Sequence, residues 1–503
     1  MKLAARARNL PGLVRALEAR ADHRDGTSRR LLVSTYFDTS DHALARQGLQ
    51  LRVREEDGHF VQTVKSDARD GVDGLTRGEW EDAIAGARPD PQAAESGRFL
   101  ASEIVGRLLP LFRTEIARRT IALTPAPDTV IEAAIDRGRV YALARDASEP
   151  VSEVELELKS GAPAALYDVA LELLAVAPLR LEQHSKAARG YRLMAHAPAP
   201  ASAAHAAAVE LDPEMSSEAA LQRIGAACLA QILHNEAAVL AGVAEGIHQM
   251  RVAVRRLRAI LSGFGKILPA EQWRHASDEL RWLADTLGPA RNLDVFTNAL
   301  LAPAQKAVAA PGLTALAAAA ERRRQTAYAK AARAVRSRRY TALLLHQLRW
   351  FESREWRAGA ASADLDEPIG ALAGRILTRR RRAAKRQSKG FARQSAQDRH
   401  KLRIALKKLR YATEALGSLY AEKAVVRFTK RLKRLQDDLG DANDLRVARG
   451  IVASLARYND DSAMIAEAGA GVVDWHERRL AGRDRRLRKD LDRLIAAKPF
   501  WKR

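Results

Sequence analysis

Residues His248–Ala259 read HQMRVAVRRLRA, and residues His400–Glu414, HKLRIALKKLRYATE, repeat the same pattern further along the chain. In each copy, basic residues follow the histidine at positions +3, +7, +8 and +10: Arg251, Arg255, Arg256 and Arg258, then Arg403, Lys407, Lys408 and Arg410. Downstream, LADTLGPARNLDV from Leu283 matches LQDDLGDANDLRV from Leu435, with the Leu-Gly pairs at +39 and +40 from their histidines. Self-similarity at a fixed spacing predicts two copies of one structural unit.

The repeated stretch has the period of an α-helix with one charged face and one apolar face. At about 100° per residue, positions 0, +3, +7 and +10 fall within an arc of about 80°, which makes a charged stripe roughly 15 Å long. We expect the opposite face to be core: Met250, Val254, Leu257 and Leu261 in the first copy, and Leu402, Leu406 and Leu409 in the second. Stacked like charges weaken an isolated helix, so two such stripes in register predict an anionic partner.

Other basic runs have a simpler interpretation. Arg379–Arg382, Arg431–Arg434 and Arg483–Lys489 each occur once, without a histidine at their head. A single row of Lys and Arg is commonly only the solvated face of a helix. We therefore interpret these runs as solvated faces that raise the local potential.

The charge of the chain is unevenly distributed. The 503 residues carry a formal net charge of +23. Residues 1–200 contain 28 Lys and Arg against 29 Asp and Glu, whereas the rest contains 56 against 32. A field of this size attracts polyanions, which leaves nucleic acid, anionic membrane and polyphosphate as possible partners. No helix-turn-helix, zinc-finger or stacking-aromatic motif is present, so nucleic acid is the least favoured of these.

Cysteine content and hydropathy bound the cellular setting. The single cysteine, Cys228, excludes an internal disulfide framework and a multi-cysteine metal site. No apolar run is long enough to span a bilayer, and Met1 does not open a signal peptide. These features predict a cytoplasmic location without a membrane partner.

The chain divides into two halves of different secondary structure. Residues 195–213, rich in Ala and Pro and almost uncharged, predict a linker. After the linker nearly every segment has helical periodicity, which predicts an all-α domain. Before it, helical patterns at Leu10–Ala21, Gln92–Leu109 and Pro163–Val176 interrupt short strands. The expected strands are Arg30–Asp38, Leu49–Glu55, His59–Lys65, Arg77–Ala83, Arg118–Leu123, Val130–Asp136, Arg139–Ala144 and Val151–Lys159.

The repeated motifs resemble a CHAD domain, the conserved histidine α-helical domain, over residues 214–498. The resemblance implies two pseudo-symmetric helical bundles whose basic helices line a positive groove and bind inorganic polyphosphate. It assigns the polyphosphate contacts to the residues of both stripes and their neighbours: His248, Arg251, Arg255, Arg256, Arg258, His400, Arg403, Lys407, Lys408 and Arg410.

Several strands of the N-terminal half carry charge at alternate positions, which places the charges on one face. The pairs and rows are Arg52 with Arg54, Glu79 with Glu81, Glu132 with Asp136, and Glu153, Glu155 and Glu157. One interpretation is an antiparallel sheet with a solvated side. The other is a closed barrel whose lumen holds phosphates on Arg and Lys and a divalent metal on carboxylates.

The strand motifs, in order, are YFDT (Tyr36–Thr39), LRVR (Leu51–Arg54), QTVK (Gln62–Lys65), RGEWE (Arg77–Glu81), IEAAIDRG (Ile131–Gly138), SEVELELKSG (Ser152–Gly161) and SKAARGYRL (Ser185–Leu193). This succession resembles a CYTH domain, the triphosphate tunnel metalloenzyme fold, over residues 1–194. The resemblance implies an α+β unit with an eight-stranded antiparallel β-tunnel and flanking helices. That family opens on Glu-x-Glu-x-Lys; here Lys2 corresponds to the lysine, and the positions of both glutamates precede residue 1.

The CYTH resemblance also implies a ligand set. It assigns triphosphate binding to Lys2, Arg52, Arg54, Lys65, Arg118, Lys186 and Arg189. It offers Glu79, Glu81, Asp136, Glu153, Glu155 and Glu157 as ligands for Mg²⁺ or Mn²⁺. In-line attack of a metal-organised water on the terminal phosphorus would then release phosphate.

Together these expectations describe a cytoplasmic, metal-dependent hydrolase of inorganic triphosphate or a related short triphosphate, fused to a polyphosphate-binding helical domain. The helical domain could hold long chains or place the enzyme on polyphosphate granules. The alternative is a polyphosphate-associated scaffold whose barrel is a catalytically weak phosphate grip. The missing acidic opening favours the scaffold, and the later acidic strands favour the enzyme.

Overall fold

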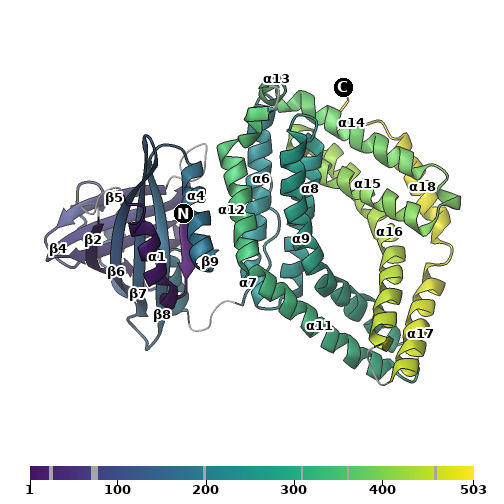
Figure 1. The fold of residues 1–503 in the computed structure, drawn as a ribbon, viewed down its shortest axis with the longest axis horizontal. Coiled ribbons are helices and arrows are strands. Elements are labelled where there is room, and N and C mark those ends of the chain that lie inside the picture. The colour runs from purple at the N-terminus through teal and green to yellow at the C-terminus, as the bar shows by residue number, and fades with distance from the viewer. Residues whose placement is uncertain are drawn as a thin grey trace. The chain divides into compact units, whose positions relative to one another are not determined.

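The computed structural model describes residues 1–21, 27–69, 77–195, 200–307, 310–359, 362–457 and 461–502. The chain forms two compact units, residues 1–200 and residues 201–503 (Figure 1). The first unit combines a β-sheet with short helices, and the second is all-helical. This is the expected order of an α+β unit followed by an all-α unit. Within the described residues, no helix has the length and apolar character needed to cross a membrane.

The first unit is built on one antiparallel sheet. Its strands, within the described residues, are β1 (Lys2–Ala5), β2 (Thr27–Asp38), β3 (Leu49–Glu56), β4 (His59–Arg69), β5 (Arg77–Ile84), β6 (Leu109–Ala126), β7 (Thr129–Ala142), β8 (Ser148–Ser160) and β9 (Leu179–Leu181). Their order in the sheet is β5-β4-β3-β2-β6-β7-β8-β1-β9. The α-helices in the described part of this unit are α1 (Leu10–Glu18), α2 (Ala43–Arg46), α3 (Ser102–Val105), α4 (Ala164–Val176) and α5 (Lys186–Met194).

The sheet has nine strands, not the eight expected. Two expected strands, Val130–Asp136 and Arg139–Ala144, are one continuous strand, β7, which passes through Gly138. The glycine does not break the strand; it lets the neighbouring strand approach, because a Cβ there would collide with the backbone carbonyl of Glu115 on β6. The two strands that the sequence did not predict, β1 and β9, are too short to show an alternation of apolar and polar residues.

The predicted helix at Gln92–Leu109 is wrong. Only the short α3 and a 3₁₀ turn lie in this segment, and Leu109 already begins β6. Tertiary hydrogen bonds hold the loop in place: the Asp82 carboxylate accepts from the backbone and hydroxyl of Ser96 at 2.7 and 2.6 Å, and the Gln62 amide accepts from the Asp90 N–H at 2.7 Å. These bonds offer the backbone an alternative to helical pairing.

The second unit contains two copies of one helical arrangement. The helices of the first copy are α6 (Ser217–His234), α7 (Glu236–Leu240), α8 (Ala244–Phe264), α9 (Ala270–Asp294), α10 (Ala302–Gln305), α11 (Leu313–Val335) and α12 (Arg338–Ser353). A π-helical segment, Val295–Leu301, joins α9 to α10. After α13 (Ser362–Asp366), the second copy comprises α14 (Ile369–Ser388), α15 (Ala396–Ala415), α16 (Glu422–Arg457), α17 (Ser462–Leu480) and α18 (Arg483–Ala496).

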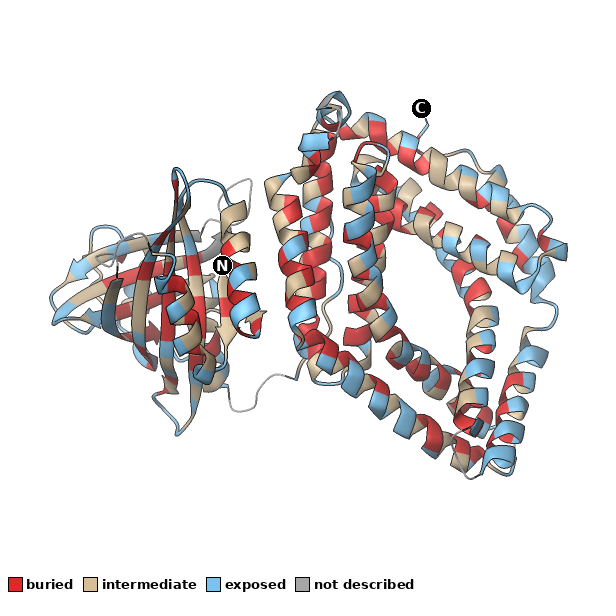
Figure 2. Cartoon of the chain, in the orientation of Figure 1, coloured by how far each residue is buried: buried red, intermediate tan, exposed pale blue. Residues whose placement is uncertain are grey.

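A constant offset relates the first three long helices of the two copies. Helices α6 and α14 begin at residues 217 and 369, α8 and α15 at 244 and 396, and α9 and α16 at 270 and 422, so each pair is 152 residues apart. The stripe helices α8 and α15 pack on each other. Figure 2 shows buried residues along the sides where the helices of each bundle meet.

The predicted core of the stripe helices is confirmed. Met250, Val254, Leu257 and Leu261 are fully buried, and so are Leu402, Leu406 and Leu409. The period of 3.6 residues therefore sorted the two faces of α8 and α15 correctly. It follows that each stripe lies on the face turned away from the core of its own copy.

Candidate functional site

The inner face of the sheet lines a cavity of about 1010 Å³. Side chains from β1 to β8 and from α5 contribute to its wall. The lining residues that the sequence had singled out are Lys2, Arg52, Arg54, Lys65, Glu79, Glu81, Arg118, Glu132, Asp136, Glu155, Glu157 and Lys186. Glu153 and Arg189 do not line it but lie behind the wall, 1% and 8% exposed. The cavity thus gathers most of the predicted phosphate-binding and metal-binding side chains.

Three basic side chains from β3 and β4 form one part of the wall. The Arg52 guanidinium lies 3.4 Å from both Glu79 and Glu81, and the Lys65 ammonium lies 2.6 Å from Glu79. Arg54 has a buried Nε atom without a hydrogen-bond partner among the described residues. Burial and the neighbouring Arg52 lower the pKa of both Arg54 and Lys65. These cations are held close together at an electrostatic cost that a bound anion would relieve.

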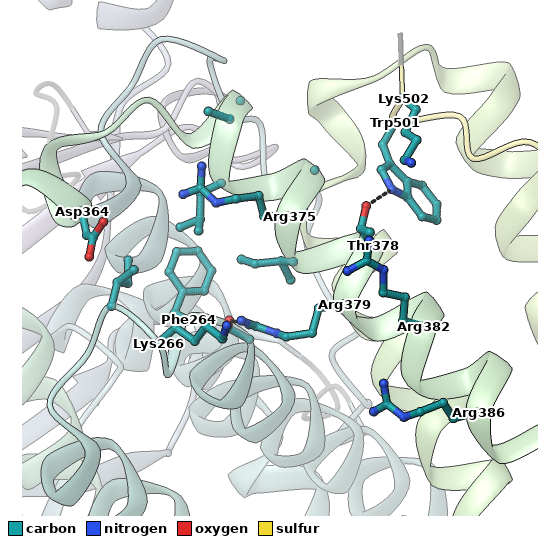
Figure 3. Close-up of a pocket in the computed structure, with 17 residues that line it drawn as sticks. Phe264, Lys266, Asp364, Arg375, Thr378, Arg379, Arg382, Arg386, Trp501 and Lys502 are labelled. Atoms are coloured by element: carbon teal, nitrogen blue, oxygen red, sulfur yellow. Dashed lines mark hydrogen bonds between the residues drawn. The ribbon is translucent and has the colours of Figure 1, made fainter.

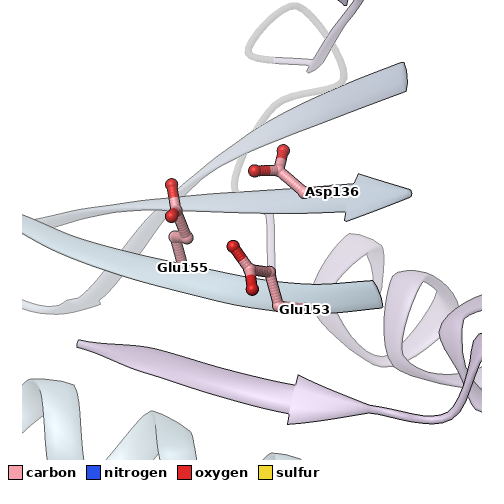
Figure 4. A group of neighbouring side chains, drawn as sticks. All are labelled: Asp136, Glu153 and Glu155. Carbon is pink, nitrogen blue, oxygen red and sulfur yellow. The ribbon is translucent and has the colours of Figure 1, made fainter. Parts of the chain in front are cut away.

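Three carboxylates converge on the other part of the wall. Asp136 of β7 is paired in register with Glu153 of β8, and Glu155 follows on the same face of β8. One oxygen atom from each lies within 4.8 Å of the others (Figure 4). Asp136 and Glu153 are almost completely buried. A cluster of buried carboxylate oxygens fits a hard divalent cation such as Mg²⁺ or Mn²⁺.

Basic side chains surround this acidic cluster. The Lys186 ammonium from α5 lies 2.7 Å from Asp136, 2.5 Å from Glu153 and 3.0 Å from Glu155. Arg118 donates two hydrogen bonds to Asp136, at 2.7 and 2.6 Å, and one to Glu155 at 2.6 Å. Lys2 is 3.1 Å from Glu155. Although burial opposes it, the attraction of Lys186, Lys2 and Arg118 holds the pKa of Glu155 far below its usual value.

The remaining predicted residues lie outside this cluster. Arg189 binds Glu149 at 2.7 Å and Glu153 at 3.3 Å, so it orients the acids from behind. Glu157 pairs with Lys159 at 2.8 Å near the cavity rim. Sequence reasoning missed Lys159, although it continues the alternation of Glu153, Glu155 and Glu157 on β8. It also did not predict that the acids and the phosphate-binding cations would neutralise one another.

In the second unit, the two stripes lie on facing helices. Arg255 and Lys407 occupy the same position of the repeat, 152 residues apart, and are half-buried. Burial, then Arg403, Arg255 and Arg410, lower the pKa of Lys407 to about 7. Burial is also the main cause that lowers the pKa of Arg403, and Arg255 of the other copy contributes. The positive charges of both copies therefore share one partly desolvated region.

The histidines and the first arginine of the stripes have distinct environments. Burial and the nearby Arg291 lower the pKa of His248 to about 4, so this ring is neutral at pH 7. His400 lies 3.3 Å, through Nδ1, from the side-chain oxygen of Asn443. Arg251 is 7% exposed and donates to the backbone carbonyl of Ala284 on α9. A Cβ on Gly288 would lie 3.2 Å from its guanidinium, so the Leu-Gly motif makes room for Arg251.

The residues at position +8 differ from the stripes. Arg256 is buried on the side of α8 that faces Cys228 and Glu414. Burial raises the pKa of both groups, and the charge of Arg256 opposes this rise without cancelling it. Burial lowers the pKa of Lys408, and Arg380 and Arg258 lower it further. Arg258 reaches Ser277 at 3.3 Å, and Arg410 reaches Glu414 at 3.3 Å. The structure thus separates Arg256 from the other predicted polyphosphate contacts.

Comparison with known proteins identifies both units. A family model of the CYTH domain matches residues 14–191, and a family model of the CHAD domain matches residues 223–453. The crystal structure of the CHAD domain from the plant Ricinus communis aligns with a TM-score of 0.52 and 29% identity, over 60% of this chain and 98% of that chain.

Two curated relatives match parts of the sequence. An inorganic triphosphatase of Haemophilus influenzae is 34% identical over 164 residues, which are 32% of this chain and 46% of that protein. An uncharacterised protein of Mycobacterium tuberculosis is 31% identical over 225 residues, which are 44% of this chain and 42% of that protein. The chain therefore spans less than half the length of these curated relatives.

Proposed function

Because the chain joins a CYTH domain, matched at residues 14–191, to a CHAD domain, matched at residues 223–453, we propose that it hydrolyses a short triphosphate in its first unit and binds inorganic polyphosphate in its second. Inorganic triphosphate is the proposed substrate, since the Haemophilus relative is named an inorganic triphosphatase. The observation that carries the proposal is the cavity in which Arg52, Arg54 and Lys65 line the same space as Asp136 and Glu155 of the carboxylate cluster.

The division of charge within the cavity suits phosphoryl transfer. Asp136, Glu153 and Glu155 would hold Mg²⁺ or Mn²⁺, which supplies charge neutralisation on the phosphates and activates water. Arg52, Arg54 and Lys65 bind and orient the non-bridging phosphate oxygens. In-line attack of water on the terminal phosphorus breaks one phosphoanhydride bond and yields orthophosphate and diphosphate. Positioning and charge neutralisation account for the rate enhancement, so no nucleophilic side chain is required.

The reaction is tested directly by measuring phosphate release. The purified full chain is incubated with inorganic triphosphate, thiamine triphosphate and nucleoside triphosphates, with Mg²⁺, with Mn²⁺ or with a chelator. The proposal expects orthophosphate from inorganic triphosphate only in the presence of the metal. Release that continues in the chelator would contradict metal dependence.

The ion pairs inside the cavity favour a second candidate function. Lys186 lies within 3.0 Å of all three acids, and Arg118 and Lys2 also pair with Glu155. With the acids neutralised in this way, the first unit would bind phosphate groups without hydrolysing them, and the protein would act as a polyphosphate-associated scaffold. Absence of phosphate release from every triphosphate, together with tight triphosphate binding, would support this candidate.

Polyphosphate binding is proposed for the second unit, which holds the excess of positive charge. We expect residues 201–503 alone to bind inorganic polyphosphate, because both stripes lie there and the Ricinus CHAD domain is a comparable separate chain. Counterion release makes such binding salt-dependent, so affinity should fall roughly 100-fold or more between about 50 and 200 mM salt. Calorimetry on both fragments checks this; binding by residues 1–200 alone would contradict it. Attachment to polyphosphate granules would follow from the same contacts.

Lys407 should make this binding sensitive to pH. Its pKa of about 7 in the folded chain lies below its value when unfolded, because burial and the charges of Arg403, Arg255 and Arg410 outweigh Asp444. A phosphate anion favours the protonated form, so binding takes up a proton. Affinity should therefore weaken, by roughly tenfold, between about pH 6.5 and 8.5.

The same shift predicts the opposite trend for the unliganded fold. The unfolded chain binds the Lys407 proton up to its ordinary pKa, so this group makes the folded state more stable as pH rises from about 7 to 10. Binding curves and thermal unfolding at several pH values check both trends. The Lys407→Arg variant keeps its charge and should lose the pH dependence; an unchanged dependence would assign it to another group.

A further inference from the structure

Helix α14 carries a row of arginines outside the two stripes. Four of its seven basic residues, Arg375, Arg379, Arg382 and Arg386, line a cavity of about 910 Å³ together with Lys266 and Lys502 (Figure 3). Their spacing of four, three and four residues places them within an arc of about 60°, along roughly 16 Å of helix. This face is therefore a second basic surface of the helical unit.

Much of the charge in this row is not neutralised. Arg375 pairs with Glu367, and Arg379 donates to the backbone carbonyl of Gly263 at the end of α8. Within the described part of the chain, Arg382 and Arg386 form no ion pair, and neither do Lys266 and Lys502; all four are exposed. The one carboxylate in the cavity wall, Asp364, lies near Arg375. The cavity thus has a surplus of positive charge at its Arg382 end.

The internal repeat shows that the fold does not need the two middle charges of this row. With the offset of 152 residues, Arg379 and Arg382 correspond to Ala227 and Ala230 on α6, whereas the end residues Arg375 and Arg386 correspond to Arg223 and His234. Helix α6 packs on α8 as α14 packs on α15. Like charges one turn apart also destabilise a helix. Only the second copy completes the row with Arg379 and Arg382, at a cost to helix stability. This difference points to a ligand and argues against the solvated-face interpretation of this run.

The row is continuous with the stripes. Arg380, the neighbour of Arg379, donates to the Ala259 carbonyl at 3.1 Å and to the Ser262 hydroxyl at 2.8 Å, both on the stripe helix α8. Lys408, the neighbour of Lys407 in the second stripe, lies close enough to Arg380 and Arg258 for their charges to lower its pKa further than burial alone does. Basic side chains therefore run from the stripes along the end of α8 to α14.

We propose that the α14 row extends the polyphosphate site, so that the protein selects long inorganic polyphosphate chains over short ones. This inference rests on the proposed binding of polyphosphate by the stripes. A chain long enough to reach both places binds the α14 row at a high effective concentration, whereas a short chain fills the stripes alone. Phosphate fits better than nucleic acid, because the two aromatic rings in the cavity wall, Phe264 and Trp501, are only 1% and 7% exposed. Trp501 also donates to Thr378 at 3.0 Å. Neither ring offers a face on which a base could stack.

The test compares two double variants of the full chain. Arg382→Ala with Arg386→Ala removes the two exposed arginines of the row that form no ion pair within the described residues. The matched control, Arg323→Ala with Arg333→Ala, removes two exposed arginines of α11, which form no ion pair within the described residues. Dissociation constants are measured for inorganic polyphosphates of about 10 and about 100 phosphates at several salt concentrations.

The inference expects a loss that depends on chain length. The α14 variant should bind the long chain about tenfold more weakly and the short chain within about twofold, and its salt slope for the long chain should fall by about 1.4. The control should bind both lengths within about twofold of the unsubstituted protein. Restoring the charge with Arg382→Lys and Arg386→Lys should recover most of the long-chain affinity.

Other results would overturn the inference. Equal losses for both lengths, or the same loss in the α11 control, would show only a general effect of charge. A loss confined to single-stranded RNA of matched length would make the row a nucleic-acid site. An unsubstituted protein that binds neither polyphosphate would overturn the proposed function as well, whereas normal binding with no effect at α14 overturns this inference alone.

Discussion

Glu155→Gln is expected to lower metal-dependent triphosphate hydrolysis about a thousandfold, because it removes one of three convergent carboxylates without changing the shape of the side chain. The fold should survive, since Asp136 and Glu153 still pair with Lys186 and Arg118. Triphosphate binding without metal should remain as tight or become tighter, because one negative charge leaves a cavity that keeps its cations. Phosphate release and calorimetric binding separate these two effects.

The control is another glutamate of the same unit. Glu172 lies on α4, outside the cavity, and pairs at the surface with Arg20. Glu172→Gln should keep hydrolysis within about twofold, since surface ion pairs contribute little to stability. Polyphosphate binding by the second unit should be unchanged in both variants. Full hydrolysis by Glu155→Gln would remove the carboxylate cluster from the mechanism.

Replacing Arg255 and Lys407 together by Gln is expected to weaken polyphosphate binding about 100-fold. Each residue is half-buried in the region shared by the two stripes, and a charge-assisted hydrogen bond to a phosphate in such a place contributes about 1.5 kcal/mol or more. Because the two positions are equivalent in the repeat, the single variants should each lose about tenfold. Titration of labelled polyphosphate measures all three variants.

The same double substitution should stabilise the fold while it weakens polyphosphate binding. The two side chains repel each other and Arg403 in the unliganded protein, so their removal should raise the free energy of unfolding by about 1 kcal/mol. Arg323→Gln on α11, an exposed arginine, serves as the control and should change neither property appreciably. Strongly unequal single variants would contradict a symmetric groove, and a loss of both stability and binding would assign the pair a structural role.

Periodicity in the sequence was sufficient to assign faces. On α8 and α15, a period of 3.6 residues separated the buried leucines from the charged stripes. On β3 and β8, a period of two placed Arg52 with Arg54 and Glu153 with Glu155 on the side that lines the cavity or backs its wall. Spacing determines which residues of one element share a face, and these assignments needed nothing more.

Relations between elements could not be derived in the same way. The pairing of Lys186 on α5 with acids of β7 and β8 depends on how the helix closes over the sheet, which no local pattern records. The burial of Arg256, whose charge acts on Glu414 of α15, depends on the packing of α15 on α8. Around Gly138, the sequence predicted a break between two strands. In the structure Gly138 lies within one strand, β7, where it allows β6 to approach closely. The loop at residues 92–109 is held at Ser96 by hydrogen bonds to Asp82 on β5 and Gln62 on β4, which the local sequence of the loop does not reveal.

The first three long helices of the two copies are related by a constant offset of 152 residues. Arg255 and Lys407 are equivalent residues on two helices that pack against each other, so the two stripes are related as they would be in a homodimer. Two identical chains, each with the length of one copy, could build this pair of stripes without any covalent link. Gene duplication and fusion, in turn, allow each copy to change alone. The pair Ala227 and Arg379 is such a change: a dimer of identical chains would have had to carry the arginine on both sides or on neither.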